Sequence, residues 1–424
     1  MMTPHHDGDW ERKMDVAKSE SLASGSRYAW AIVFAAFLCF GIVYGTVTYS
    51  FTIFVNPLSK AFGVSPTQIV LGFTLLNVGT GVLGMAAGRV MTRFPIRNVM
   101  VGGLILLSAG FFALSMVQSI WQFYLAYALI VAFGSIIVAP LGASAIVSNW
   151  FATNRGRALT VATLGTSFGQ LLIPPFAARI IESGGWEGAY RAFAVLMLIA
   201  VVPIALLVVD RPEKKGMTPY GADQADDQPQ VPAEALMSNM DIVKRRDFWS
   251  IASSYLLTVL VYLALVATIV PYARTFGVTA LQASQMTVCM GIFAIIGKIG
   301  FATFADRMGL RNTFWIAIGL NLTALILLST VPTYNILFVA SALIGGSAGG
   351  VLPVWPGLIA SRFGPRALPQ VMGLMSPLVL SLQGFGAPIA TGMHYRPAFL
   401  IFIGLLVVSA FISRNFAKPS AEAK

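Results

Sequence analysis

Apolar segments of about 20 residues recur along the chain, and they restrict the possible folds more than any other feature. A helix rises ~1.5 Å per residue, so a segment of this length can cross the hydrocarbon core of a bilayer. Twelve such segments are present: residues 28–55, 67–91, 98–116, 121–147, 158–181, 189–209, 249–273, 281–304, 313–331, 335–360, 369–392 and 396–413. The sequence therefore predicts an all-α membrane protein with twelve transmembrane helices.

The composition fits a chain whose surface faces lipid. Of the 424 residues, 57% are hydrophobic and only 11% are charged. Soluble domains carry about 25% charged residues, because water must hydrate their surface. The composition therefore argues against a soluble globular protein and indicates that the chain lies in a lipid bilayer.

One long polar stretch divides the chain into two groups of six segments. Residues 210–246 are rich in Asp, Gln, Pro and Lys and are too few to bury a core of their own. We expect six-helix bundles over residues 28–209 and 247–414, with 210–246 as a cytoplasmic linker. Residues 1–27 lack the apolar core of a signal peptide, so they are expected to be a disordered cytoplasmic tail, as are residues 415–424.

Positive charge indicates the orientation of the helices. Most of the 28 Lys and Arg residues lie in segments that would be cytoplasmic if the amino terminus were inside. Cytoplasmic loops of membrane proteins are enriched in these residues. Both termini are therefore predicted to be cytoplasmic. The net charge of +11 then reflects membrane topology, and no nucleic-acid partner is expected.

A short motif repeats after the second and the eighth predicted helix. The first copy reads Gly-Arg-Val-Met-Thr-Arg-Phe-Pro-Ile-Arg, and the second reads Ala-Thr-Phe-Ala-Asp-Arg-Met-Gly-Leu-Arg. The residues of interest are Gly88, Arg93 and Arg97 in the first copy and Asp306, Arg307 and Arg311 in the second. The repeat indicates an internal duplication, and hence two pseudo-symmetric halves.

Two halves of six helices with this loop resemble the major facilitator superfamily, whose pattern there is Gly-x-x-x-Asp-Arg-x-Gly-x-Arg. The resemblance implies alternating access and a cytoplasmic gate, in which the loop residues latch the halves together. The sequence departs from the pattern at Thr92, where Asp is usual, and at Ala302, where Gly is usual. In the alternative interpretation, the Arg residues only enforce membrane topology.

Several patterns along the chain are similar to the bacterial monocarboxylate and oxalate/formate carriers of that superfamily. They are Tyr28-Ala-Trp30, Tyr49-Ser-Phe-Thr-Ile-Phe54, Trp121-Gln-x-Tyr124, Trp150-Phe151 before Arg155-Gly156, and Gly185-Trp186. Each pattern is weak alone, but all of them occur in order at the corresponding helices. The resemblance implies a secondary transporter for a small organic monocarboxylate in the inner membrane of a bacterium.

Lys298 is the only ionised side chain predicted to lie deep within a span. It precedes Asp306 by eight residues, which corresponds to about 12 Å of helix. A charge at the bilayer centre costs at least ~2.5–3.5 kcal/mol, so it usually marks a binding site or an ion pathway. In the carriers that the chain resembles, an Arg at this position binds the substrate carboxylate, which implies that role for Lys298. Alternatively, Lys298 extends to the cytoplasmic headgroups.

Other polar and aromatic residues fall on helices that line the transport path in this superfamily. With Lys298, the predicted substrate-binding set comprises Tyr44, Thr48, Asn77, Gln170, Tyr262, Trp355 and Gln383. Hydrogen bonding between helices would explain these residues equally well. No Asp or Glu falls in the middle of a span, so coupling to protons and exchange against a counter-anion both stay open.

Nothing in the sequence is typical of an enzyme, a cofactor site or a metal site. Cys39 and Cys289 lie within apolar runs, and the three His residues are scattered. The glycines around Gly165 and Gly345 lack the Lys-Ser/Thr of a phosphate-binding loop, so close helix packing is the better interpretation. A monomer is expected.

Two further functions stay open. An efflux carrier for hydrophobic compounds would use the same scaffold, although Gly169 is followed by Gln170 rather than by the Pro of the exporter motif. A membrane sensor that binds a ligand without transporting it is the other alternative. Neither the tails nor the linker looks like an output domain for such a sensor.

Overall fold

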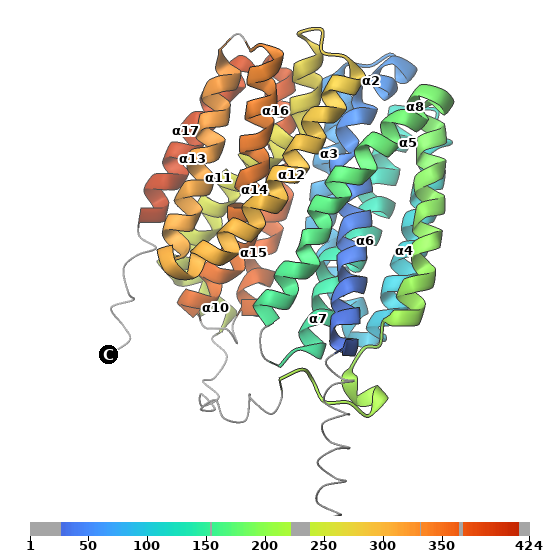
Figure 1. The fold of residues 1–424 in the computed structure, drawn as a ribbon, viewed down its shortest axis with the longest axis vertical. Helices are drawn as coiled ribbons and strands as arrows, with labels where there is room; N and C mark the ends of the chain where they lie inside the picture. The colour runs from blue at the N-terminus through green and yellow to red at the C-terminus, as the bar shows by residue number, and fades with distance from the viewer. Residues whose placement is uncertain (1–26, 153–154, 222–237, 331, 364–367, 415–424) are drawn as a thin grey trace, which may run out of the picture.

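The computed structural model describes residues 27–152, 155–221, 238–330, 332–363 and 368–414, with most of the side chains in these ranges. Most of the described residues lie in helices, and one isolated β-bridge joins Phe151 to Tyr220. The long helices run side by side (Figure 1). The prediction of an all-α protein is confirmed.

The first half of the chain begins with a helix over Arg27–Phe62, which contains η1 (Tyr44–Tyr49) and α2 (Phe51–Phe62). It continues with α3 (Pro66–Arg93), α4 (Ile96–Leu114) and α8 (Arg155–Leu207). Between α4 and α8, one helix over Ile120–Trp150 alternates between α- and π-helical geometry. Its parts are α5 (Ile120–Leu125), η2 (Ala126–Val131), α6 (Ala132–Ile136), η3 (Ile137–Ala143) and α7 (Ser144–Trp150).

The second half contains five long helical segments. Two short helices, η4 (Pro212–Lys215) and α10 (Asn239–Lys244), precede them. The long segments are α11 (Arg246–Arg274), α12 (Ala280–Met308), α13 (Leu310–Ser329), α14 (Tyr334–Phe363), and α15 (Leu368–Leu382) continued by η5 (Gln383–Phe385) and α16 (Gly386–Gly392). The last helix, α17, covers Arg396–Ile412.

Ten helices of the described chain are long and apolar enough to cross a membrane, and α17 is a shorter apolar helix. One of the ten is α8, although Gly185 breaks its helical geometry with φ 72°. A left-handed φ is accessible to glycine because it has no Cβ atom. Dividing α8 at Gly185 and adding α17 would give the twelve predicted spans, so that number stays a prediction.

The helices extend beyond the apolar segments seen in the sequence. The first helix reaches Phe62 rather than residue 55, and α12 reaches Met308 rather than residue 304. The end of a helix depends on local capping and not on where the lipid ends. Gly63, with φ 65°, terminates α2, and a capping box between Ser65 and Gln68 starts α3.

Two apolar cores lie within the bundle. One is formed mainly by side chains between Ala29 and Val208, and the other mainly by side chains between Ile242 and Leu406. Tyr49 is an exception, since it belongs to the first helix but packs in the second core. This arrangement agrees with two bundles, although the boundaries given above for the bundles, linker and tails stay predictions.

Glycines bring helices of the same half into direct backbone contact. A Cβ atom at Gly165 would overlap the backbone of Phe37, and one at Gly169 would overlap that of Gly41. In the second half, a Cβ atom at Gly345 would overlap the backbone of Met290. Small residues allow helices to approach closely where no hydrophobic driving force acts between them. The glycine clusters therefore pack helices, as the sequence predicted.

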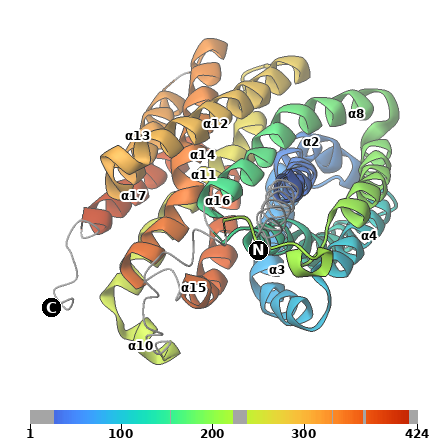
Figure 2. The ribbon, with the colours of Figure 1, turned by 60° about the horizontal axis from the view of Figure 1, so that its bottom comes forward.

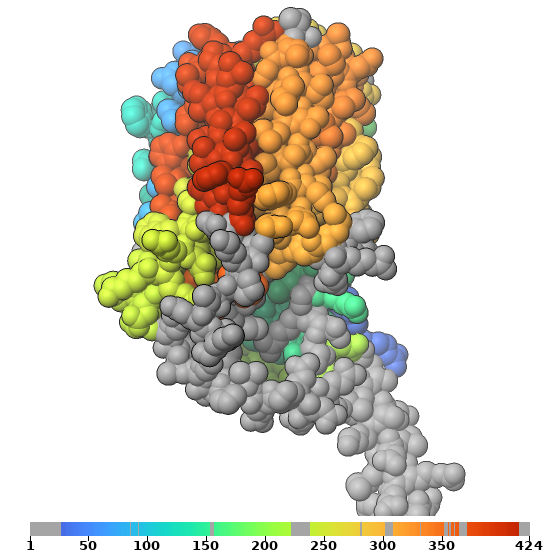
Figure 3. Space-filling view, turned by 90° about the vertical axis from the view of Figure 1, so that its left-hand side faces the viewer, coloured from blue at the N-terminus to red at the C-terminus, as the bar shows by residue number. Residues whose placement is uncertain are grey.

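Three sets of helices connect the halves. The first pairs α8 with α12, the second pairs α3 with α15 and α16, and the third pairs α2 with α11. Figure 2 shows α8 and α12 side by side near the middle of the molecule. On the outer face of the second half, α13 and α17 lie next to each other (Figure 3). Exposed Leu400, Val407 and Phe411 on α17 give this face an apolar surface that suits lipid.

Candidate functional site

Lys298 connects the two halves of the protein. Its side chain is 5% exposed in α12, and its Nζ donates hydrogen bonds to two groups of α8. One acceptor is the backbone carbonyl of Thr163 at 3.0 Å, and the other is Oγ1 of Thr166 at 2.5 Å. In this conformation the ammonium group therefore contacts the opposite half and does not extend to the lipid headgroups.

Close helix packing holds the backbone of Lys298 in place. A Cβ atom at Gly349 of α14 would overlap the backbone of both Gly297 and Lys298. Likewise, a Cβ atom at Gly297 would overlap the backbone of Gly346. The glycines of α14 therefore pack against the backbone of α12, while the Lys298 side chain extends from α12 to α8.

No carboxylate in the described part of the chain balances the charge of Lys298. Among the described residues, Lys298 is the only charged one that is buried. Its two acceptors on α8 are both neutral, and an ammonium group has three N–H donors. A buried charge without a counter-charge is strongly disfavoured. The site is therefore chemically suited to receive an anion.

Tyrosine hydroxyls continue from this contact into the second half. The Tyr49 hydroxyl of η1 lies beside the hydroxyls of Thr166 in α8 and Tyr262 in α11. The contact with Tyr262 is not a well-formed hydrogen bond, since the buried Tyr262 oxygen has no partner at hydrogen-bonding geometry. Lys298, Thr166, Tyr49 and Tyr262 thus form a continuous polar path between the halves.

An aromatic pair lies at the end of this path. The rings of Tyr255 in α11 and Trp355 in α14 are stacked, with centroids 4.8 Å apart and an interplanar angle of 12°. Tyr255 also interacts electrostatically with Tyr262 and with Tyr44 of η1. Tyr44 packs against both apolar cores. The stacked pair therefore lies where the first helix meets the second half.

Several buried polar atoms of these helices have no hydrogen-bond partner among the described residues. They are both amide atoms of Gln170, Oγ of Ser167, the Tyr262 hydroxyl and Nε1 of Trp355. Gln170 follows Thr166 by four residues, so both lie on one face of α8. Buried polar groups are normally satisfied, and such a group calls for an explanation, for which a ligand is one candidate.

Two other predicted substrate residues bond to each other instead. Nε2 of Gln383 donates to Oδ1 of Asn77 at 3.0 Å, which joins η5 to α3. Beside this bond, Oγ1 of Thr74 donates to the backbone carbonyl of Gly384 at 2.7 Å. These contacts form a second polar connection between the halves. Thr48 lies half-buried in η1.

The predicted gate residues lie at the ends of the helices. Arg93 is exposed at the end of α3, and Gly88 lies on the same helix with open space around it. The backbone N–H of Arg97 donates to Oδ1 of Asp210 at 2.8 Å. The guanidinium of Arg311 lies 5.3 Å from the ring centre of Trp315. Asp306 and Arg307 have side chains outside the described residues, so the gate stays a prediction.

Sequence reasoning missed several residues of the site. Thr163 and Thr166 accept the Lys298 hydrogen bonds, Tyr49 extends the path, and Tyr255 stacks on Trp355. A helical-spacing signal was present for two of them. Thr166 precedes the predicted Gln170 by four residues, and Tyr255 precedes the predicted Tyr262 by seven, so each pair shares one helix face.

Comparisons with known proteins point to one family. The model of the Major Facilitator Superfamily matches residues 33–329 and 251–423. The oxalate:formate antiporter of Oxalobacter formigenes is 25% identical, over 93% of this chain and 92% of that protein. Monocarboxylate transporter 12 of Rattus norvegicus is 24% identical, over 94% of this chain and 87% of its own length.

The names of other relatives refer to different substrates. The riboflavin transporter MCH5 of Saccharomyces cerevisiae is 25% identical, over 94% of this chain and 80% of that protein. Among solved structures, a POT family transporter in complex with 5-aminolevulinic acid matches with a TM-score of 0.72 and 14% identity, covering 92% of this chain and 97% of that one. At this identity the structural match supports the fold alone.

Proposed function

The chain belongs to the major facilitator superfamily, and we propose that it transports a small organic monocarboxylate by alternating access. Membership makes the protein a multi-pass membrane carrier of small molecules rather than an enzyme. The resemblance noted in the sequence is confirmed at the level of the superfamily, with oxalate:formate and monocarboxylate carriers among the relatives.

The observation that carries the proposal is the environment of Lys298. Its ammonium group is buried between the halves, and its acceptors on α8 are both neutral. A substrate carboxylate would supply the missing negative charge through charge-assisted hydrogen bonds, which are about twice as strong as neutral ones. One buried positive charge also matches one carboxylate better than two.

The body of the substrate would contact residues from both halves. Tyr44, Gln170, Tyr262 and Trp355 are the predicted contacts, and the last three carry unpartnered polar atoms. Thr48 is the fifth candidate. Asn77 and Gln383 already pair with each other, so they would contribute to substrate binding only after their bond has opened.

Alternating access requires contacts that differ between two states of the protein. Lys298 with Thr166, and Gln383 with Asn77, hold the halves together in the present conformation. An anion that binds Lys298 would compete with its acceptors on α8, so binding would change the balance between the two states. The predicted cytoplasmic gate would hold the halves together on the cytoplasmic side in another state of the transport cycle.

The membrane setting completes the proposal. Both termini would be cytoplasmic, in the inner membrane of a bacterium, with the protein acting as a monomer coupled to protons or to a counter-anion. The fujikurins efflux protein of Gibberella fujikuroi, which is also a relative, favours a second candidate. This alternative is an efflux carrier for hydrophobic compounds.

Flux measurements separate the two candidates. Purified protein in liposomes should transport labelled monocarboxylates, and Lys298→Ala should abolish their uptake. Lys60→Ala is the matched control, because Lys60 is exposed at the end of α2. Undiminished uptake of acids by Lys298→Ala would overturn the proposal, whereas flux of neutral hydrophobic compounds alone would favour the efflux carrier.

A further inference from the structure

Five aromatic side chains lie along and at the end of the polar path that begins at Lys298. Tyr44 and Tyr49 belong to the first half, whereas Tyr255, Tyr262 and Trp355 belong to the second. The Tyr49 hydroxyl lies beside that of Tyr262, and Tyr44 interacts with Tyr255. Aromatic side chains of both halves therefore meet on the path that begins at Lys298, the only buried charge in the described part of the chain.

Elsewhere, the polar tips of buried aromatic side chains find partners. Nε1 of Trp150 donates to the Val209 carbonyl at 2.7 Å, and the Tyr272 hydroxyl donates to the Leu328 carbonyl at 2.7 Å. A buried Trp or Tyr usually obtains such a bond. Of the described aromatic residues outside the site, Tyr127 and Tyr190 alone depart from this rule, and they lie beside each other in the first core.

In the site itself, two such tips are unsatisfied. Trp355 is 7% exposed and Tyr262 is 1% exposed, yet neither Nε1 of Trp355 nor the Tyr262 hydroxyl has a partner among the described residues. Tryptophan N–H is a donor only. The site therefore offers hydrogen-bond donors and aromatic surface together, which suits a ligand with both an acceptor and a flat ring.

We propose that the transported acid carries an aromatic ring, which Trp355 and Tyr255 recognise while Lys298 binds its carboxylate. The inference rests on the proposed function and narrows its substrate class. A small aliphatic acid could also touch these residues, but it would make no contact between aromatic rings. An aromatic monocarboxylate would bury its ring against the stacked pair, and its oxygens would accept from the free donors.

The two ring types give a matched pair of probes. Benzoate and cyclohexanecarboxylate carry the same charge and the same number of heavy atoms, but only benzoate has an aromatic ring. Contacts between aromatic rings contribute about 0.5–1.5 kcal/mol beyond area burial, or about twofold to tenfold in affinity. We therefore expect titration calorimetry to show that the full-length protein binds benzoate about twofold to tenfold more tightly than cyclohexanecarboxylate.

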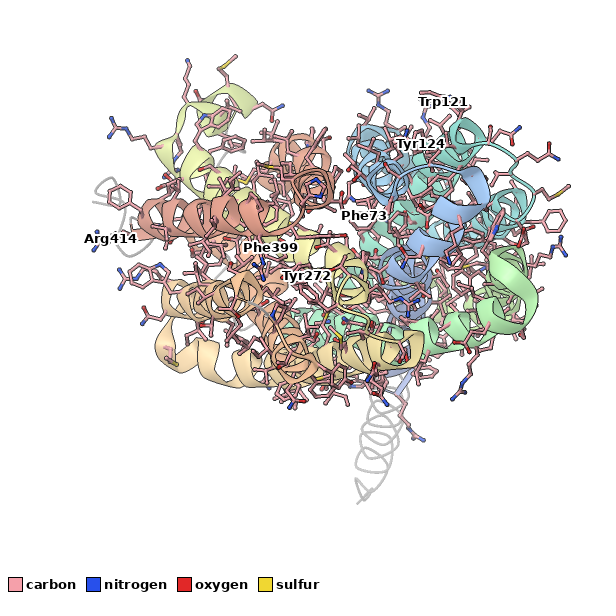
Figure 4. The ribbon with its side chains drawn as sticks, turned by 90° about the horizontal axis from the view of Figure 1, so that it is seen from above. Phe73, Trp121, Tyr124, Tyr272, Phe399 and Arg414 are labelled. Carbon is pink, nitrogen blue, oxygen red and sulfur yellow. The ribbon has the colours of Figure 1, made fainter. Side chains whose placement is uncertain are left out.

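Variants of Trp355 test whether this residue causes the preference for benzoate. Trp355→Leu should remove the preference for benzoate while binding of cyclohexanecarboxylate persists, and Trp355→Phe should keep most of the preference. Trp121→Leu is the control, because Trp121 is 72% exposed and lies at the edge of the first half (Figure 4). It should bind both acids as the parent does.

The outcomes distinguish this inference from the proposed function. Equal affinity of the parent protein for the two acids, or an undiminished preference in Trp355→Leu, would overturn the aromatic specificity and leave the carboxylate site intact. Undiminished binding of both acids by Lys298→Ala would overturn the carboxylate site, and the ring inference with it. Failure of the parent protein to bind any monocarboxylate would likewise overturn both the carboxylate site and the ring inference.

Discussion

Lys298 of α12 reaches across to Thr166 of α8, with Nζ 2.5 Å from the threonine hydroxyl oxygen. The two residues are 132 positions apart in sequence and belong to opposite halves. Their contact places the buried charge of the protein at the surface along which the halves must move.

Removing the Thr166 hydroxyl should favour acids, since the substrate would compete with this hydroxyl for Lys298. In Thr166→Val, Lys298 keeps only the Thr163 carbonyl as an acceptor on α8. Hydrogen bonds to charged groups contribute about 1.5–3 kcal/mol, so we expect the uptake efficiency for acids to rise by about tenfold to a hundredfold. Thr163→Val is the control, because Thr163 holds Lys298 through its backbone. Similar flux in the two variants would contradict this assignment.

The pairing of Asn77 with Gln383 should appear as energetic coupling between the halves. We expect the destabilisation by Asn77→Ala and Gln383→Ala to be non-additive, with a coupling of about 0.5–1.5 kcal/mol. Thermal unfolding of the two single variants and the double variant in detergent measures this coupling. Strict additivity would show that the 3.0 Å bond does not hold the halves together.

Close approach of α14 to α12 should make Gly349 intolerant of a side chain. Gly349→Ala would place a Cβ atom into the backbone of Gly297 and Lys298. Overpacking of this kind typically costs about 1–3 kcal/mol, so thermal stability and acid uptake should both fall. Gly102→Ala is the control, since nothing lies within 4 Å of a Cβ atom there. Parental stability and uptake in Gly349→Ala would contradict the packing.

Asp210 should contribute a pH-dependent part of the stability. Its partial burial raises the pKa of the carboxyl, but the hydrogen bonds from Lys214 and from the Arg97 backbone N–H outweigh this, so the pKa of Asp210 is lowered. A lowered folded pKa gives stability that is present above the unfolded pKa and lost as the pH falls through the folded pKa.

The comparison with Asp210→Asn isolates this contribution. The parent protein should lose its stability advantage over the variant between about pH 5 and about pH 2, because an unfolded Asp titrates near 3.9. Thermal unfolding of both proteins across that range is the measurement. An advantage of the same size at both ends of the range would show that the Asp210 carboxylate is not involved.

Much of the fold was predictable because lipid imposes a simple rule on sequence. Every span needs a long apolar run, so the helices and the polar break at residues 210–246 are visible directly. The helix ends were less predictable, since they depend on caps such as Gly63 and Ser65. The break in α8 at Gly185 falls between the predicted segments 158–181 and 189–209, although the sequence alone did not indicate the backbone angle of this glycine.

The site was predictable only where chemistry stands out against an apolar background. Lys298 is conspicuous as a charge within a span, and Trp355 as a large polar-tipped ring. The partners of Lys298 were not, because Thr166 looks like any helix threonine and the Thr163 acceptor is a backbone carbonyl. Asn77 and Gln383 were predicted separately, and their bond depends on tertiary packing that no spacing encodes.

The most direct test of the account compares a transported monocarboxylate with its amide, which has nearly the same shape but no charge. Titration calorimetry measures binding of both compounds to the parent protein and to Lys298→Gln. We predict that the parent prefers the acid by at least about tenfold, as expected for a charge-assisted bond, and that Lys298→Gln does not distinguish the two. A full preference for the acid in Lys298→Gln would contradict the claim that Lys298 receives the substrate carboxylate.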